Sequence, residues 1–156
     1  MHLNHILKMP NCPKCNAKTQ KNQPCKLHTC KYAPKCFHHS KVKVGASNIA
    51  GRGLIARDDI RKGEIVADYK IGTTKLTRNE FMQRYPTGRA THVWSPGGNV
   101  YYDGSNLNKS VAGAANRGSG NNRANARINA GGKLITKQNI KRGSEILVSY
   151  GSAFRL

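Results

Sequence analysis

Acidic side chains are scarce in this chain, which has seven Asp and Glu residues against 27 Lys and Arg and a formal net charge of +20. Residues 1–41 contain eight lysines and no acid, and beyond residue 80 only Asp103 and Glu145 are negative. A field of this sign attracts polyanions, so we expect a basic surface that binds nucleic acid. Because no base-reading motif accompanies the charge, the contacts should go mainly to phosphates.

Long hydrophobic runs are absent as well. No stretch approaches the roughly 18–20 apolar residues that cross a bilayer, so we expect no membrane partner. The first residues also lack the apolar stretch of about 7–15 residues that marks a secretory signal, which favours an intracellular protein over a secreted one. A chain of 156 residues then has room for one domain with a small appendage.

Cysteine is absent after residue 36, and all five cysteines lie between Cys12 and Cys36. Their odd number, close spacing and interleaved histidines favour metal ligands over disulfides, and free thiols are typical of a reducing compartment. Residues 1–41 have too few apolar side chains to fold around a core, so a bound metal would supply the missing free energy. We therefore expect a basic, Cys/His-rich zinc-binding module over residues 1–41; the alternative is a disordered basic tail.

The zinc ligands can be narrowed by spacing. Zinc takes four nitrogen or sulfur ligands in a tetrahedron, and Cys36 and His39 are spaced to offer two ligands from one turn. The segment also resembles a small Cys/His motif of phage and giant-virus proteins, which implies that Cys15 and Cys25 complete the site. Three alternates remain open: Cys30 in place of Cys15, together with Cys12 and His38.

The rest of the chain has short apolar runs between glycine-rich turns, which predicts a mainly β fold with few short helices. No strand–helix–strand repetition is present, which argues against a doubly wound parallel sheet. Thr77 and Glu80 form a capping-box pattern that opens a helix, and Pro86 ends it after Tyr85. Residues 104–132 lack periodicity, and their composition alone would make them a flexible linker. The expected strands cover residues 41–45, 51–57, 64–69, 91–95, 99–103, 134–136 and 146–150, with a turn at Pro96-Gly97-Gly98.

Two distant segments carry a more specific pattern. One is Gly51-Arg52-Gly53-Leu54-Ile55-Ala56-Arg57 with a following Lys62-Gly63-Glu64 turn, and the other is Gly143-Ser144-Glu145-Ile146-Leu147-Val148-Ser149-Tyr150-Gly151. With the Asn- and Gly-rich region between them, this order resembles the SET domain, the protein-lysine methyltransferase fold that uses S-adenosylmethionine. The resemblance covers residues 42–156. It implies a SET-type β-clip fold of small sheets with a knot-like C-terminal segment, in which the region 104–132 is threaded to form the cofactor site.

The resemblance also implies roles for single residues. Tyr150 matches the tyrosine beside the transferring methyl group, and Tyr69 matches another tyrosine of the lysine channel. Trp94 is either core or part of a peptide groove with His92. The family's Asn-His-Ser reads Asn116-Arg117-Gly118 here, and its Pro-Asn reads Ala124-Asn125. The implied cofactor-binding residues are Gly51, Arg52, Gly53, Asn116, Arg117 and Phe154, of which the glycines would let backbone approach the cofactor and Phe154 would close the channel.

The implied function is transfer of a methyl group from S-adenosylmethionine to a lysine of a histone or of another basic protein associated with nucleic acid. Methyl transfer needs no metal, so the zinc would be structural. The expected location is the nucleus, on chromatin, or a virion, and the short SET-like core with its Cys/His module suggests a viral or microbial source. The alternative is a catalytically inactive SET fold that serves as a basic nucleic-acid-binding or virion structural protein. Either protein could form a homodimer.

Overall fold

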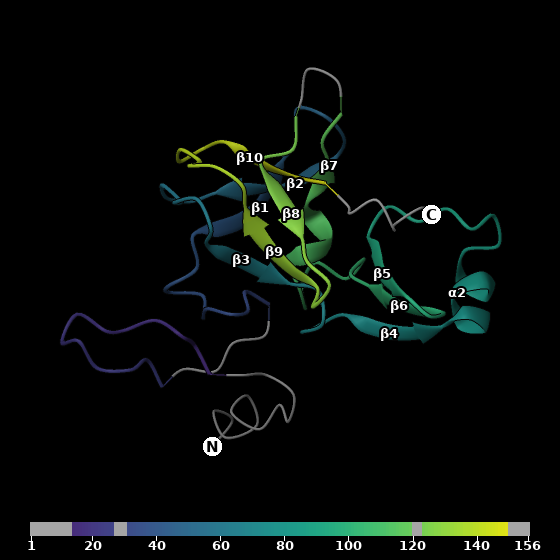
Figure 1. Cartoon of the computed structure of the whole chain (residues 1–156), viewed down its shortest axis with the longest axis horizontal. Coiled ribbons are helices and arrows are strands. Elements are labelled where there is room, and N and C mark those ends of the chain that lie inside the picture. The colour runs from purple at the N-terminus through teal and green to yellow at the C-terminus, as the bar shows by residue number, and fades with distance from the viewer. Residues whose placement is uncertain (1–13, 27–30, 120–122, 150–156) are drawn as a thin grey trace.

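The computed structural model describes residues 14–26, 31–119 and 123–149 (Figure 1). These residues form a mainly β fold with one α-helix and one 3-10 helix, which confirms the predicted fold class. The strands make a seven-stranded sheet and a separate three-stranded sheet. In the larger sheet, neighbours follow the order β1–β2–β10–β8–β9–β3, and β7 pairs with β10 beside this path. Its strands are β1 Val42–Ala46, β2 Arg52–Ala56, β3 Ile65–Asp68, β7 Asn116–Arg117, β8 Ala126–Ile128, β9 Lys133–Thr136 and β10 Glu145–Ser149.

Strand β10 joins segments that are far apart in the sequence. It pairs antiparallel with β2, where Glu145 lies opposite Ile55. It also pairs in parallel with β7 and β8, where Val148 lies opposite Arg117 and Ala126. Parallel neighbours cannot be joined by a tight hairpin, so the chain crosses over between them. The described parts of the region 104–132 are therefore held in place by β10, so the flexible linker that composition alone would predict is wrong.

The main core lies against this sheet. Ile146 and Val148 are fully buried and share one face of β10, because strand side chains alternate between faces. The 3-10 helix η1, Ala112–Ala114, adds small buried residues to the same core. It sits so close to the preceding segment that a Cβ on Gly104 would lie 3.1 Å from Gly113 Cα. Glycine at this crossing lets two backbone segments touch.

The smaller sheet has the order β4–β6–β5 and lies beside helix α2 at one end of the molecule (Figure 1). Its elements are β4 Thr74–Thr77, α2 Arg78–Arg84, β5 Val93–Gly97 and β6 Val100–Asp103. The predicted capping box is present, since Glu80 N donates to Thr77 Oγ1 at 3.2 Å and Thr77 N donates to Glu80 Oε1 at 3.1 Å. The helix packs through buried Phe81, whose ring stacks on Tyr101 with centroids 4.1 Å apart.

One local prediction about this sheet is wrong, and one of its strands was missed. Strand β5 continues to Gly97, so the turn to β6 is Gly98-Asn99 rather than Pro96-Gly97-Gly98. Gly98 and Asn99 have φ angles of 66° and 61°, the two positive values that a type I′ hairpin requires. Strand β4 was not predicted. Only Leu76 of its four residues is buried, which leaves little hydrophobic pattern to detect.

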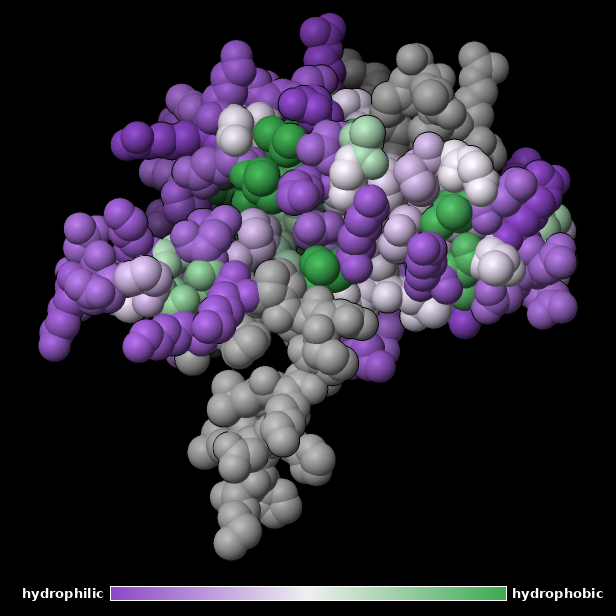
Figure 2. All heavy atoms as spheres, turned by 60° about the horizontal axis from the view of Figure 1, so that its bottom comes forward, coloured by the Kyte–Doolittle hydropathy of each residue, from purple (hydrophilic) through white to green (hydrophobic). Residues whose placement is uncertain are grey.

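The surface is largely hydrophilic. On the face in Figure 2, hydrophobic side chains appear only in small separate areas. Among the described residues, the large hydrophobic side chains that are exposed are Phe37, Ile49 and Met82. In the same part of the chain, no helix is both long enough and apolar enough to span a bilayer.

Candidate functional site

The N-terminal module brings four predicted metal ligands into one cluster. The segment around residues 17–25 folds back on itself, with Cys25 N donating to Ala17 O at 2.9 Å, and this places Cys15 beside Cys25. A tight turn from Cys36, in which His39 N donates to Cys36 O at 3.1 Å, presents the other two side chains. The three cysteines are buried, and the candidate ligand atoms all lie within 4.8 Å of one another.

The cluster fits zinc. His39 Nδ1 lies 3.5 Å from Cys15 Sγ and 3.2 Å from Cys36 Sγ. A tetrahedral zinc with ordinary bond lengths separates sulfur and nitrogen ligands by about 3.5 Å, so a small adjustment would admit the ion. Cys25 supplies the fourth ligand atom. The Cys15, Cys25, Cys36 and His39 set is thus the one that the structure brings together.

The alternates fall elsewhere. Cys12 and Cys30 lie outside the described residues, and His38 is exposed with its ring against Phe37 instead of joining the cluster. Burial raises the pKa of the Cys36 thiol, and its neighbour Cys15 raises it further. Burial also acts to raise the pKa of Cys15, but hydrogen bonds from the backbone at Cys36 and Ala17 outweigh it and lower that pKa.

A second constellation forms where β1 turns into β2. Ser47 Oγ accepts hydrogen bonds from Ile49 N at 2.9 Å and Ala50 N at 3.2 Å, and Ser47 N donates to Gly51 O at 3.0 Å. Gly51 has a φ of 50°, and a Cβ placed on it would meet nothing within 4 Å. The turn from Ser47 to Gly51 is thus tight and internally bonded, with open space beside Gly51. Its last residue and the first two residues of β2, Arg52 and Gly53, are here called the Gly51–Gly53 loop.

Asn116 ties this loop to β10. Its Nδ2 lies 3.3 Å from Ala50 O, 3.1 Å from Arg52 O and 2.9 Å from Glu145 Oε1. It also lies 3.1 Å from Ser47 Oγ. The structure therefore brings together three of the segments for which the sequence predicted a shared site: the Gly51–Gly53 loop, Asn116 and the last strand.

Two residues of this constellation were not predicted, namely Ser47 and Glu145. Ser47 Oγ donates to Glu145 Oε1 at 2.7 Å, and a Cβ built on Gly53 would collide with the Glu145 carboxylate. Gly53 therefore makes room for a protein side chain, whereas the sequence had suggested only room for a cofactor. Glu145 could have been singled out in the sequence because acids are scarce there: it is one of two negative residues beyond position 80.

The other predicted site residues have separate environments. Arg117 follows Asn116 in β7 and lies opposite Val148 of β10. Tyr69 is buried in the main core, and its ring lies 6.1 Å from that of Trp94, which is also buried. Trp94 thus belongs to the core. His92 Nδ1 lies 2.6 Å from Gly113 O and so contacts η1. Tyr150, the residue after β10, and Phe154 both lie outside the described residues.

Asn125 proves to be a structural residue. Its Nδ2 donates to Glu145 O at 2.9 Å, and its Oδ1 accepts from Leu147 N at 2.9 Å. Its amide satisfies both a donor and an acceptor of the β10 backbone, so it fixes the strand that leads to Tyr150. This asparagine needs no preceding proline for that contact, since Ala124 stands there.

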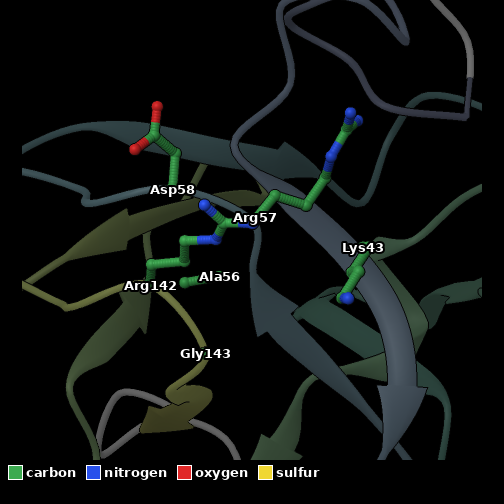
Figure 3. A pocket seen from close by; sticks show the side chains of 6 residues that line it. All are labelled: Lys43, Ala56, Arg57, Asp58, Arg142 and Gly143. Atoms are coloured by element: carbon green, nitrogen blue, oxygen red, sulfur yellow. The ribbon is translucent and has the colours of Figure 1, made fainter.

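Two polar cavities lie near β2. One, of about 420 Å³, is lined by Arg52 and residues 105–108 and adjoins the Gly51–Gly53 loop. The other, of about 390 Å³, lies at the opposite end of β1 and β2, where Val42 pairs with Ala56. Figure 3 shows the basic side chains of Lys43, Arg57 and Arg142 around it, together with Asp58. Three cations against one acid make the second cavity suited to anions and unsuited to a cationic ligand.

Comparison with known proteins decides the family. A sequence model of the SET domain matches residues 51–151, which include the Gly51–Gly53 loop, Asn116 and all of β10. The chain belongs to the SET-domain family. Proteins of this family are in general protein-lysine methyltransferases that use S-adenosylmethionine. No curated protein matches the sequence.

A solved structure supports the same fold. A Plasmodium falciparum protein assigned provisionally as a histone methyltransferase aligns with a TM-score of 0.50 and 19% sequence identity. The alignment covers 74% of this chain and 97% of that one. At this sequence identity the likeness shows that the two proteins share the SET fold.

Proposed function

We propose that this SET-domain protein is an S-adenosylmethionine-dependent protein-lysine N-methyltransferase. One observation carries the proposal: the amide of Asn116 meets both the Gly51–Gly53 loop and Glu145 of β10, the strand that leads into Tyr150. The same contact joins the three segments that the sequence assigned to one cofactor site. Asn125 adds to this by holding the same strand.

The residues present fit the cofactor. S-adenosylmethionine carries a sulfonium and an ammonium group, and it supplies the methyl group that is transferred. The loop offers a left-handed glycine with open space, and backbone can approach a ligand there without a side-chain collision. Arg52 and residues 105–108 border a polar cavity large enough for part of such a ligand. Asn116 and Glu145 present oxygen atoms, which suit a cationic partner.

The chemistry assigns the tyrosines. A lysine amine has a pKa near 10.4, so it must lose its proton before its lone pair can attack the methyl carbon as the carbon–sulfur bond breaks. An apolar channel favours the neutral amine by desolvation and aligns nitrogen, carbon and sulfur. Tyr69 lies in the main core beside Trp94, and we propose that its ring closes the inner end of such a channel. We assign Tyr150 to orient the amine and the methyl group.

The substrate follows from charge. A protein of net charge +20 repels a free histone tail, which is also basic. We therefore propose a lysine in a histone, or in another basic protein, that is presented on nucleic acid to which both partners bind. As the location of the protein we propose chromatin in the nucleus, or a virion. A homodimer stays a prediction from the sequence.

A second function is favoured by the Cys/His module itself. The described part of the chain has only two ion pairs, Lys41–Glu64 and Arg84–Asp103, and neither uses a lysine of the segment 14–35. Residues 14–26 extend to the side of the larger sheet (Figure 1). We propose that this segment binds nucleic-acid phosphates, alone in an inactive structural protein or beside an active methyl-transfer site. Its exposed lysines are Lys14, Lys18, Lys21 and Lys26.

Calorimetry with S-adenosylmethionine on the full chain tests the first function directly. We expect binding to the wild type and weaker binding to Asn116→Ala, with methylation of lysine in nucleosomes exceeding that of free histones. Asn79→Ala is a suitable control because Asn79 is exposed on helix α2, outside both the Asn116 contacts and the cavity beside Arg52. A wild-type protein that binds no cofactor at millimolar concentration would instead support the structural function.

A further inference from the structure

Glu145 and Ser47 surround the amide nitrogen of Asn116 with oxygen atoms. The four atoms within 3.3 Å of Nδ2 are Ser47 Oγ, Ala50 O, Arg52 O and Glu145 Oε1. Two of these are backbone carbonyls and one is a carboxylate, which can only accept hydrogen bonds. Ser47 Oγ uses its own proton on Glu145 and is left as an acceptor here.

This surrounding fixes which way the amide faces. If the amide were turned over, its carbonyl oxygen would lie against two carbonyls and a carboxylate, all carrying negative charge. The nitrogen must therefore face inward, and Oδ1 lies on the other side of the amide carbon. Within the described residues, no hydrogen bond to Asn116 Oδ1 is found. The oxygen is thus an acceptor available to a ligand.

The Glu145 side chain, which accepts a hydrogen bond from the Asn116 amide, is itself fixed by other contacts. Glu145 pairs with Ile55 of β2 through the backbone, and its carbonyl accepts from Asn125 Nδ2 at 2.9 Å. Its carboxylate lies against Gly53, where only a glycine leaves room for it. Ser47 links the same carboxylate to the turn before Gly51 through its bonds to Ile49 N and Ala50 N.

We infer that Glu145 and Ser47 are positioning residues that hold the Gly51–Gly53 loop and the Asn116 amide, so that Asn116 Oδ1 is aimed at a cationic amino group of the ligand. The inference rests on the proposed cofactor, but the arrangement exists in the protein without it. A side chain that is already oriented loses less entropy when the ligand binds, so the network should act on affinity. It should leave the bond-making step largely unchanged.

Ser47 and Asn116 both donate to the same oxygen of the Glu145 side chain, Oε1. Glutamine is therefore the conservative replacement that separates the loss of charge from the loss of this acceptor. Glutamine can keep a carbonyl oxygen at that place, so Glu145→Gln should bind S-adenosylmethionine within about threefold of the wild type. Glu145→Ala should weaken binding by about tenfold or more, as expected for loss of a hydrogen bond to a charged group. Ser47→Ala should give a smaller loss, and kcat of each variant should change less than its cofactor KM. Glu64→Ala is the matched control, because it also removes a half-buried carboxylate but one that pairs with Lys41.

The experiment combines calorimetry with nuclear magnetic resonance of the Asn116 side-chain amide in the cofactor-free protein. Slow exchange of these protons in the wild type and in Glu145→Gln, with fast exchange in Glu145→Ala, would support the inference even if no cofactor bound and the proposed function failed. Equal cofactor affinity in the wild type and Glu145→Ala would overturn it. So would a Glu145→Gln variant as weak as Glu145→Ala, since charge would then be the cause. If Glu145→Ala does not fold, Ser47→Ala decides by the same two measurements.

Discussion

Arg57 connects the Cys/His module to the SET domain by way of Phe37. Its Nη1 donates to Phe37 O at 2.9 Å, and its guanidinium lies 5.0 Å from the centre of the Phe37 ring. Phe37 directly follows the metal-ligand candidate Cys36, whereas Arg57 directly follows β2 and lines the basic cavity in Figure 3. Unfolding of the module should therefore remove these contacts and loosen the chain at the end of β2.

Zinc removal is the first test of this connection. We expect about one zinc per chain in protein purified without chelator, and chelation should unfold the segment 14–41 and lower the melting temperature, because this segment has almost no core of its own. Cys25→Ser should lose the metal, whereas the matched variant His38→Ala should keep it, since His38 lies outside the cluster. Elemental analysis measures the zinc content, and amide hydrogen exchange measures whether the segment is folded. Metal-free wild-type protein with an ordered module would contradict the prediction.

Nucleic-acid binding should depend steeply on salt. Counterion release gives a slope of about −0.9 in log affinity against log salt concentration for each phosphate contacted. Replacing Lys18 and Lys21 by glutamine should reduce that slope by up to about 1.8. Replacing Lys75 and Lys109, which are equally exposed but lie outside the module, should change it less. Fluorescence anisotropy with a short duplex at several salt concentrations gives the slopes, and equal slopes for the two double variants would remove the module from the interface.

Methyl transfer should depend on the hydroxyl of Tyr150. Tyr150→Phe should lower kcat and kcat/KM together, by about 100-fold or more, because the lost hydrogen bond acts mainly in the transition state. Cofactor affinity should stay within a few-fold of the wild type. Tyr101→Phe is the control, since that ring stacks on Phe81 in the smaller sheet. A Tyr150→Phe enzyme with normal turnover would show that another group orients the amine.

The smaller sheet should be sensitive to acid through Asp103. Its buried carboxylate accepts from Arg84 Nη1 at 2.8 Å, Tyr85 OH at 2.8 Å and Ser105 N at 2.9 Å. Burial alone would raise the pKa of Asp103, but the hydrogen bonds from Arg84, Ser105 and Tyr85 outweigh it, so the pKa is lower than the usual 3.8.

The folded protein therefore binds this proton less readily than the unfolded chain. The resulting stability is present above about pH 4 and is lost as the pH falls through the lowered pKa. Asp103→Asn should lower the free energy of unfolding at pH 7 by about 1–3 kcal/mol and should flatten its dependence on pH below about 4. Asp58→Asn, at an exposed position, should change neither the free energy of unfolding nor its dependence on pH. Urea unfolding at a series of pH values measures the effect, and parallel curves for Asp103→Asn and the wild type would contradict it.

Features that depend on neighbours along the chain could be predicted from the amino-acid sequence. The capping box of Thr77 and Glu80, most strands and the turn that pairs Cys36 with His39 follow from short-range bonds and the alternation of buried side chains. The family pattern was likewise readable, because it lies in two continuous segments, and the SET match confirms it. The net charge can also be counted from the sequence alone, although the nucleic acid that it should attract is still a prediction.

Contacts between distant parts of the chain became visible only in the folded protein. Residues 104–132 gain η1, β7 and β8 because β10 supplies their hydrogen-bond partners, which a composition rich in Asn and Gly does not reveal. Asn116 and Glu145 are 29 positions apart, and Ser47 and Glu145 are 98 apart, so no local pattern could link them. Gly53 is a glycine for the same reason: the side chain it must accommodate comes from the other end of the domain, and packing brings the two together only in the folded chain.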